Sequence, residues 1–387
     1  MHRLKSIKLY FFSILKLSYL SFRNYYFKSN FYNKNLVTFI PTRIFYSPSA
    51  YLSASLTTIS DNFYKFSNVS PELLWKTSIK NKLNFENLHG FLWLAKLDRK
   101  NSKIFTKNII NSWIDNFFNY DPNTWKMEIT SKRIISWASN TDITLQESDK
   151  SYKKKFFISL IKQSNFLLKN LTSVPNDSAK FICCSAIILS GIIFEENDSA
   201  YKIGIKELEK IANSYFDKSG FPKSRNPEEV FICIKYLILI REWFKEAQKP
   251  IPNFLDEIIL KCGNCYAILC CSNKQFPLFN GATEINHKDY DIFLKTLKYK
   301  FINKNHEIAD LIKIKKNKFE FFIDCGNPPP NNFTKYYQAG CLAFELISNK
   351  HKVICNSGYG KYLSPKLTLL GRSTAAHSTL YINDTSS

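Results

Sequence analysis

The chain has 387 residues, of which 45% are hydrophobic and 16% aromatic, and this composition excludes an intrinsically disordered protein. Its formal net charge of +22 would attract a polyanion. The lysines are spread along the chain rather than gathered in one block, which argues against a nucleic-acid-binding protein. Abundant Lys, Asn, Ile, Phe and Tyr are also what an A+T-rich genome produces. The charge is therefore compatible with an acidic polysaccharide partner without requiring one.

Residues 1–69 form a basic, aromatic N-terminal segment. The apolar run from Leu9 to Leu15 is interrupted by Lys16, and no small-residue cleavage pattern follows closely, so a clear signal peptide is not indicated. No stretch reaches transmembrane length. One interpretation left open is a basic amphipathic helix that rests on a membrane surface or on the rest of the protein.

Ten cysteines are present, several of them adjacent or within apolar stretches, as in Cys183-Cys184 and Cys270-Cys271. Neighbouring cysteines cannot easily bridge each other, so the set predicts reduced thiols packed in a core. Cys262 and Cys265 form a C-x-x-C motif. No second pair or spaced His completes a zinc site with it, so no metal is predicted there.

Residues 70–298 are expected to form successive amphipathic helices joined by short loops. Ser70-Pro71-Glu72 is a helix start, because Ser accepts a backbone N–H, Pro fits the first turn and Glu complements the helix dipole. Asn226-Pro227-Glu228-Glu229 repeats this pattern. Helices buried on one face stack as hairpins that curve into a solenoid or an incomplete toroid. Apolar residues at helical spacing mark 156–168, 179–194, 205–216 and 230–244.

Residues 299–387 change to a period of two, which predicts antiparallel strands. Residues 310–315 and 318–324 alternate around a turn, 343–347 and 351–355 repeat the pattern, and 377–382 is expected to begin one more strand. Such a sheet lacks partner strands and makes only a partial β-sandwich. Two expectations follow: a homo-oligomer that pairs through the exposed sheet edge, or a truncated gene product.

Four stretches resemble the heparinase II/III-like polysaccharide lyases. Residues 89–94 look like the opening helix of their barrel, 219–228 is similar to their Asp-Gly-Gly…Arg-Ser/Asn-Pro segment, and 276–281 is similar to a late barrel loop. The resemblance implies an α/α toroid of helical hairpins followed by a β-sandwich. The most specific stretch is C-terminal and comprises residues 324–330, 339–346, 353–358 and 372–380.

This resemblance implies cleavage of an acidic polysaccharide, such as a glycosaminoglycan, by β-elimination. The reaction needs a group that neutralises the uronate carboxylate, a base that removes the neighbouring proton and an acid that protonates the departing oxygen. In such lyases an Asn or His steadies the carboxylate and Tyr and His exchange protons. The resemblance also implies a bacterial periplasm or cell envelope, whereas the N-terminus and reduced cysteines favour the cytoplasm.

The family's metal site, a His–Asp–His set that braces the sandwich, is degenerate in this sequence. The sandwich-strand His falls at Gln338 and the Asp falls at Asn356, which leaves His377 as the one obvious ligand type. A lone His does not hold a metal well, so no cofactor is predicted.

The candidate catalytic residues also match the family in part. Its Asn-His pair falls at Asn176-Asp177, which keeps only the Asn. Asn176 or Asn226 is expected to neutralise the carboxylate, and Tyr337 or His377 is expected to transfer protons. The following Pro-Glu-Glu favours helix capping as the role of Asn226, and with its partner positions altered His377 is better explained as a buried residue hydrogen-bonded across the sheet.

Arg225, Arg372 and Gln338 are the candidate substrate contacts. An arginine can grip a uronate through its planar fork, although Arg225 could instead form an internal salt bridge and Arg372 could be structural. Gln338 and Asn356 replace titratable residues, so a glycan-binding or structural module that does not cleave is the alternative to a lyase. Trp93, Trp113, Trp125 and Trp137 could stack on sugars, but their helical spacing favours core packing.

Overall fold

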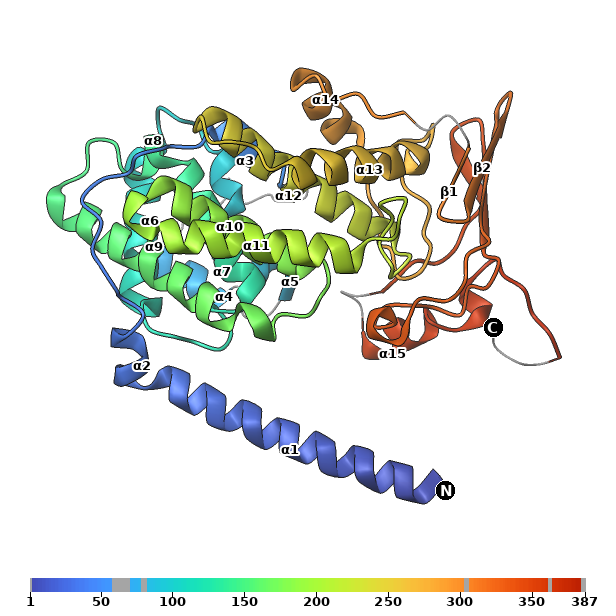
Figure 1. The fold of residues 1–387 in the computed structure, drawn as a ribbon, viewed down its shortest axis with the longest axis horizontal. Coiled ribbons are helices and arrows are strands. Elements are labelled where there is room, and N and C mark those ends of the chain that lie inside the picture. Colours follow the sequence, from blue (N-terminus) through green and yellow to red (C-terminus); the bar gives the residue numbers. More distant parts are fainter. Residues whose placement is uncertain (1, 58–69, 78–81, 303–305, 361–363, 384–387) are drawn as a thin grey trace.

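The computed structural model describes residues 2–57, 70–77, 82–302, 306–360 and 364–383. Figure 1 shows most of the helices gathered into one body, with an antiparallel sheet at the end of that body where the chain finishes. The predicted order, helical hairpins followed by the opening sheet of a β-sandwich, is confirmed.

The N-terminal helices are α1 (His2–Lys28), α2 (Asn30–Lys34) and α3 (Ala50–Ala54). The helical body contains α4 (Pro71–Thr77), α5 (Lys82–Gly90), α6 (Lys103–Phe117), α7 (Met127–Ser139), α8 (Thr141–Thr144), α9 (Lys150–Asn170), α10 (Ser178–Ile193), α11 (Asp198–Tyr215), α12 (Pro227–Glu246), α13 (Asn253–Leu269) and α14 (Lys288–Thr296). The sheet contains β1 (Glu307–Ile308), β2 (Leu311–Lys316), β3 (Phe319–Asp324), β4 (Phe344–Ser348) and β5 (His351–Ile354), and α15 (Pro365–Leu370) follows it.

The helix starts are where the local sequence predicts them. α4 begins at Pro71 and α12 begins at Pro227. The side-chain oxygen of Asn226 accepts the backbone N–H of Glu228 at 2.8 Å, which satisfies one of the free donors at the start of α12. The three other predicted helical runs lie in α9, α10 and α11.

The core of the helical body surrounds α10, which packs against α7, α9, α11 and α12. Almost every side chain of α10 is buried, so this helix is apolar on all sides rather than along one stripe. The prediction that the tryptophans pack in the core is confirmed: all four are buried, with exposed fractions of 4% or less for Trp93, Trp113, Trp125 and Trp137.

The five strands follow one another in the order β1-β2-β3-β4-β5, each antiparallel to the next. The face towards the helical body buries Leu311, Phe322 and Ile347, whereas Ile314 and Phe319 are 56% and 53% exposed on the sheet. The strand predicted at 377–382 is wrong. Ser378 and Leu380 make two backbone hydrogen bonds to the segment 341–344 beside β4, and the residues just before them form a 3-10 helix, Thr374–Ala376.

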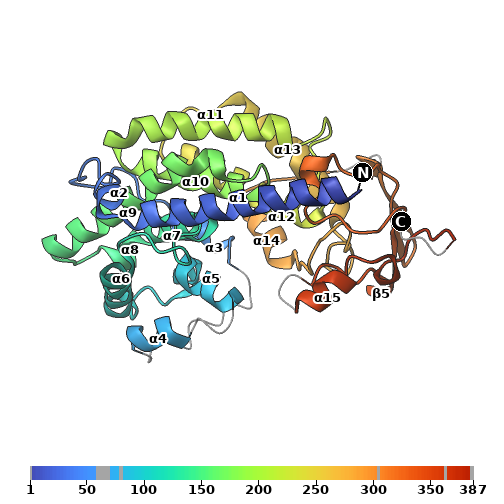
Figure 2. The same cartoon turned by 90° about the horizontal axis from the view of Figure 1, so that it is seen from below.

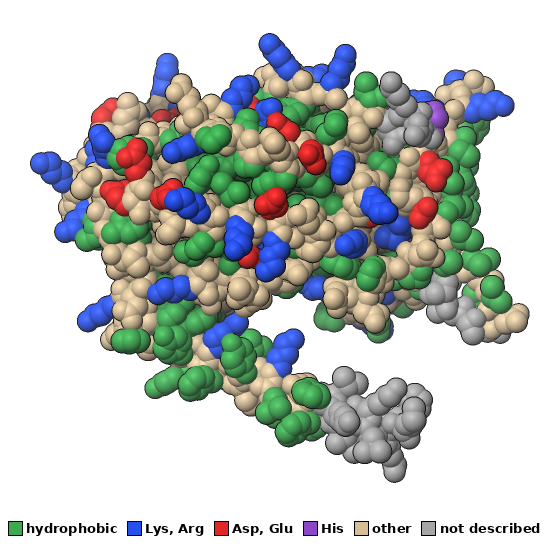
Figure 3. All heavy atoms as spheres, viewed as in Figure 1, with side chains coloured by type: hydrophobic (Ala, Val, Ile, Leu, Met, Phe, Trp, Pro, Cys, Tyr) green, Lys and Arg blue, Asp and Glu red, His purple; other side chains and the backbone are tan. Residues whose placement is uncertain are grey.

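Helix α1 lies beside the helical body rather than within it (Figures 1 and 2). Figure 3 shows exposed hydrophobic side chains along this helix. They include Phe11, Phe12, Leu17, Tyr19 and Phe22. Among the described residues, no helix is both long and apolar enough to cross a membrane.

Candidate functional site

The helical body and the sheet meet along the main chain of residues 270–278. Four charged side chains on the inner face of the sheet bind this segment: Lys313 and Lys352 donate to its carbonyl groups, and Glu320 and Glu345 accept its N–H groups. These hydrogen bonds measure between 2.6 and 3.2 Å. Charged donors and acceptors make stronger hydrogen bonds than neutral ones, so the sheet is held in one register on the body.

A second connection is centred on Arg225, which precedes α12. Its guanidinium forms an ion pair with Asp324 at the end of β3, and the two side chains are only 11% and 7% exposed. The side-chain nitrogen of Asn280 donates to the same carboxylate at 2.6 Å and to the backbone oxygen of Arg225 at 3.1 Å. The guanidinium also lies directly against Gly326, where a Cβ would sit only 2.0 to 2.3 Å from it. Of the two roles proposed for Arg225, the structure therefore shows the internal salt bridge.

Asn226 is directed into the start of α12. It is 4% exposed, and its side-chain oxygen caps the helix. The carboxylate of Glu228 then accepts the N–H of Thr283 at 3.0 Å, which joins this helix start to the loop after α13. Asn226 is buried at the helix start whereas Asn176 is exposed, which makes Asn176 the better candidate for contact with a substrate carboxylate.

Asn176 lies on an exposed loop before α10, and its side-chain oxygen accepts a hydrogen bond from Lys180 at 3.1 Å. The next residue, Asp177, pairs with Lys335 at 3.8 Å. Lys335 is two residues before Tyr337, on the segment that leads to β4. This ion pair brings the loop that carries Asn176 and the segment that carries Tyr337 side by side across the junction of body and sheet.

The phenol of Tyr337 is half-buried beside the Arg225 ion pair. Burial raises the pKa of Tyr337 above its ordinary value of 10.0, the negative charge of Asp324 raises it further, and the guanidinium of Arg225 opposes both. The phenol therefore stays protonated at neutral pH, and it is suited to donate a proton rather than to accept one.

Gln338, Asn356 and His377 are all bound to the local backbone. Gln338 is buried and contacts the Gly358 carbonyl at 3.5 Å, and the Asn356 side-chain oxygen accepts the Ser378 N–H at 3.0 Å. At the family's metal-binding positions this chain therefore has two neutral amides in place of a histidine and an aspartate. Without an anionic or imidazole ligand at either position, these two residues do not fit a zinc-type metal site.

His377 is half-buried, and its Nε2 lies 2.9 Å from the carbonyl oxygen of Gly371. Burial lowers the pKa of His377, and the hydrogen bond to Gly371 partly opposes this effect. A neutral ring that donates from Nε2 keeps Nδ1 as a free acceptor for a proton. The side chain of Arg372 is exposed, while its backbone oxygen accepts the Ala339 N–H at 3.1 Å, which ties this region to the segment of Tyr337.

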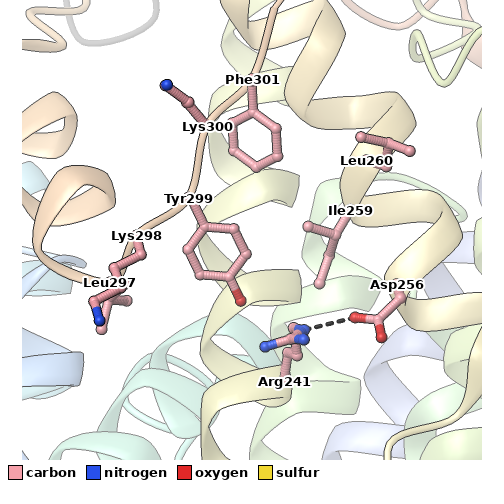
Figure 4. A pocket seen from close by; sticks show the side chains of 9 residues that line it. All are labelled: Arg241, Asp256, Ile259, Leu260, Leu297, Lys298, Tyr299, Lys300 and Phe301. Atoms are coloured by element: carbon pink, nitrogen blue, oxygen red, sulfur yellow. Dashed lines mark hydrogen bonds and ion pairs between the residues drawn. The ribbon is translucent and has the colours of Figure 1, made fainter.

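A pocket lies elsewhere, between α12, α13 and residues 297–301 (Figure 4). Its volume is about 460 Å³, and none of the predicted site residues lines it. Arg241 in its wall is neutralised by Asp256 at 2.5 Å and by Glu242 at 3.2 Å. This pocket therefore offers no free arginine to an acidic ligand.

Comparison with known proteins is consistent with these features. Residues 307–387 match the family model described as Heparinase II/III-like, C-terminal. The search of curated proteins found no match. The resemblance to the heparinase II/III-like family, inferred from the sequence motifs, is therefore confirmed over the sheet and the segments that follow it.

Solved structures extend the likeness to the helical body. A crystal structure of heparinase III has a TM-score of 0.63 at 15% identity, covering 79% of this chain and 56% of that chain. A mutant of the heparan sulfate lyase HepC from Pedobacter heparinus has a TM-score of 0.57 at 14% identity, covering 79% of this chain and 54% of that one. The chain has the heparinase III fold, and it spans little more than half the length of these structures.

Asn280 and Lys335 are among the junction residues that the sequence did not single out. Asn280 is in a left-handed conformation with φ of 50°, in the Phe-Pro-Leu-Phe-Asn-Gly stretch, where Asn before Gly is a recognisable turn signal. Lys335 is one of many lysines, and nothing local distinguishes it. Only its ion pair with a residue 158 positions earlier shows its role.

Proposed function

We propose that this protein is a polysaccharide lyase of the heparinase II/III type that cleaves an acidic, uronate-containing polysaccharide by β-elimination. The observation that carries the proposal is the Lys335–Asp177 ion pair, which sets the loop of Asn176 beside the segment of Tyr337. A substrate bound at this junction of body and sheet would meet both side chains. The domains would be the helical body of residues 70–298 and the sheet region of 299–387.

In this mechanism the amide of Asn176 donates a hydrogen bond to the uronate carboxylate and stabilises the negative charge that develops when the neighbouring proton leaves. The free Nδ1 of His377 accepts that proton, since burial keeps the imidazole neutral. Tyr337, whose raised pKa keeps the phenol protonated at neutral pH, donates its proton to the departing glycosidic oxygen. The products carry a carbon–carbon double bond conjugated with the carboxylate.

A specific observation favours a second function, in which the same scaffold binds a glycan without cleaving it. Gln338 and Asn356 are neutral and hydrogen-bonded to the backbone at positions where the family has titratable residues. If the reaction needs a histidine at position 338, this protein lacks a group that transfers a proton. The junction would then still bind a glycan but would not cleave it.

Ultraviolet absorbance of the conjugated double bond, recorded during incubation with heparan sulfate, heparin, alginate and other uronates, separates the two functions. The lyase proposal predicts a rise in absorbance that Tyr337→Phe and Asn176→Ala each reduce about a hundredfold or more. Tyr19→Phe on the exposed part of α1 is the matched control and should leave the rate unchanged.

Measured glycan binding without any rise in absorbance would overturn the lyase proposal in favour of the binding module. In that case Gln338→His tests whether the remaining groups are intact, because restored cleavage would locate the defect at this position. If none of the tested polysaccharides is bound or cleaved, both proposed functions are contradicted.

A further inference from the structure

A group of metal-ligand side chains lies where α13 ends and α14 begins. Cys270 follows the last residue of α13, His287 precedes α14, and Asp291 is in the first turn of α14. One ligand atom from each residue lies within 4.8 Å of the other two. Within the ranges that the structure covers, this is the one such group of three His, Cys, Asp or Glu side chains.

The backbone holds the two helix ends together without any ion. The intervening loop is closed by an isolated antiparallel bridge between Gln275 and Asn286, and the N–H of His287 donates to the carbonyl of Lys274 at 3.0 Å. Asp291 is four residues after His287, which places both side chains on the same face of the helix. The three groups are therefore brought together by the fold.

Hydrogen bonds already hold the side chains of His287 and Asp291 in fixed orientations, as neighbouring groups do for the ligands of known metal sites. Nδ1 of His287 lies 2.9 Å from one carboxylate oxygen of Asp291, and the hydroxyl of Tyr266 donates to the other at 2.7 Å. His287 is 1% exposed, and its Nε2 has no hydrogen-bond partner. A buried ring nitrogen without a partner is costly, so the His287 imidazole still carries an unused ligand atom.

We propose that Cys270, His287 and Asp291 bind a zinc ion. A thiolate, an imidazole and a carboxylate are a typical zinc ligand set, with water or Tyr266 available for the fourth position. Two anionic ligands would neutralise the charge of the ion, which reduces the cost of holding it in a partly buried site. Ligand atoms around tetrahedral zinc lie about 3.3 to 3.6 Å apart, so the spacings in the group must adjust towards this value on binding, and the His287–Asp291 hydrogen bond gives way to bonds to the ion.

The zinc site is separate from the degenerate positions Gln338, Asn356 and His377. It also lies next to the sheet, because the carbonyl oxygen of Cys270 accepts a hydrogen bond from Lys313 of β2 at 2.6 Å. An ion that fixes Cys270 would therefore hold the end of α13, the start of α14 and the sheet in one arrangement. The inference does not rest on the proposed lyase activity.

The test uses the full chain, stripped with a chelator and then titrated with zinc and separately with cobalt(II). We expect one zinc per chain by elemental analysis, and a cobalt complex with a thiolate-to-metal charge-transfer band. Cys270→Ser should abolish that band, and His287→Gln and Asp291→Asn should each weaken zinc binding about tenfold to a hundredfold. Cys271→Ser is the matched control, because Cys271 is also buried but its thiol contacts the carbonyl of Leu269.

A second variant keeps the test decisive if a ligand variant fails to fold. The ammonium of Lys274 is 3.4 Å from Asp291 and competes with a cation for that carboxylate, so Lys274→Met should tighten zinc binding severalfold. The proposal is overturned by zinc well below one per chain. It is equally overturned if Cys270→Ser and Cys271→Ser bind cobalt with the same spectrum, or if Lys274→Met does not tighten binding.

Discussion

Arg225 and Asp324 form a buried ion pair that joins the helical body to the sheet across 99 residues of sequence. Arg225 adopts a left-handed backbone conformation with φ of 59°, which is uncommon for a residue with a side chain. The cost of this conformation is offset by the ion pair and by the hydrogen bond from Asn280 to the Arg225 backbone. The pair therefore sets how the two parts of the protein meet.

Replacing Asp324 with Asn should destabilise the protein by about 3 to 5 kcal/mol, because it leaves a buried guanidinium without its counter-charge. Chemical denaturation measures this loss. Asp115→Asn is the control, since Asp115 pairs with Lys155 in an exposed pair whose removal should cost about 1 kcal/mol or less. Equal losses in the two variants would contradict the assignment of Arg225 to a structural ion pair.

Gly281 is the point where the loop after α13 touches the segment of Tyr337. Its φ is +91°, and a Cβ there would lie 2.5 Å from the backbone oxygen of Tyr336. Gly281→Ala should therefore displace this segment and weaken glycan binding as well as lower the melting temperature. Gly340→Ala is the control, because its Cβ would meet only the side chain of Ala343 at 3.4 Å. Similar glycan affinities in the two variants would argue that the segment of Tyr337 is not part of the site.

Glu345 is fully buried, and one carboxylate oxygen accepts the N–H groups of Leu278 and Asn356 at 3.0 and 3.1 Å. Glu345→Ala leaves both buried donors without a partner, at about 1 to 3 kcal/mol for each. We expect amide hydrogen exchange at Leu278 and Asn356 to accelerate about tenfold or more. Exchange at Phe181, in the middle of α10, should not change. Unchanged protection at Leu278 would show that the sheet does not hold the loop.

Local sequence signals predicted the elements well. Pro71, Pro227 and the cap at Asn226 mark helix starts that depend only on neighbouring residues, and the change of period near residue 300 marks the sheet. The prediction of a strand at 377–382 was wrong. Alternating apolar and polar residues also occur in a segment that runs beside a strand without a full ladder of hydrogen bonds. Helix α15 was not anticipated, since its six residues are too few for a periodic pattern.

The candidate site was less accessible to sequence reasoning. Tyr337 was a candidate only through its position in the sequence, since no motif assigns the tyrosine, and its proximity to Asp324 and Arg225 required the fold. The group of Cys270, His287 and Asp291 has irregular spacing that matches no zinc motif, so only the tertiary structure shows that the three side chains meet. Conversely, the C-x-x-C of Cys262 and Cys265 is a visible motif whose thiols contact two separate backbone carbonyls.

His89 provides a pH-dependent prediction. Its ring is fully buried and accepts a hydrogen bond from the Trp113 indole at 3.1 Å. Burial, together with the nearby charge of Arg133, lowers the pKa of His89 from 6.5 to about 3. The unfolded chain therefore takes up a proton as the pH falls through 6.5, whereas the folded chain does so only near pH 3. Stability contributed by the neutral ring is present above pH 6.5 and is lost between pH 6.5 and 3.

Each pH unit within this window should remove about 1.4 kcal/mol through His89 alone. Between pH 7 and pH 5 we expect the wild-type protein to lose about 2 kcal/mol more stability than His89→Gln, measured by urea denaturation at both values. The glutamine oxygen can still accept a hydrogen bond, and the other five histidines are the same in both proteins. An equal loss in the two proteins would contradict the prediction, because it would show that the pKa of His89 is not lowered in the folded protein.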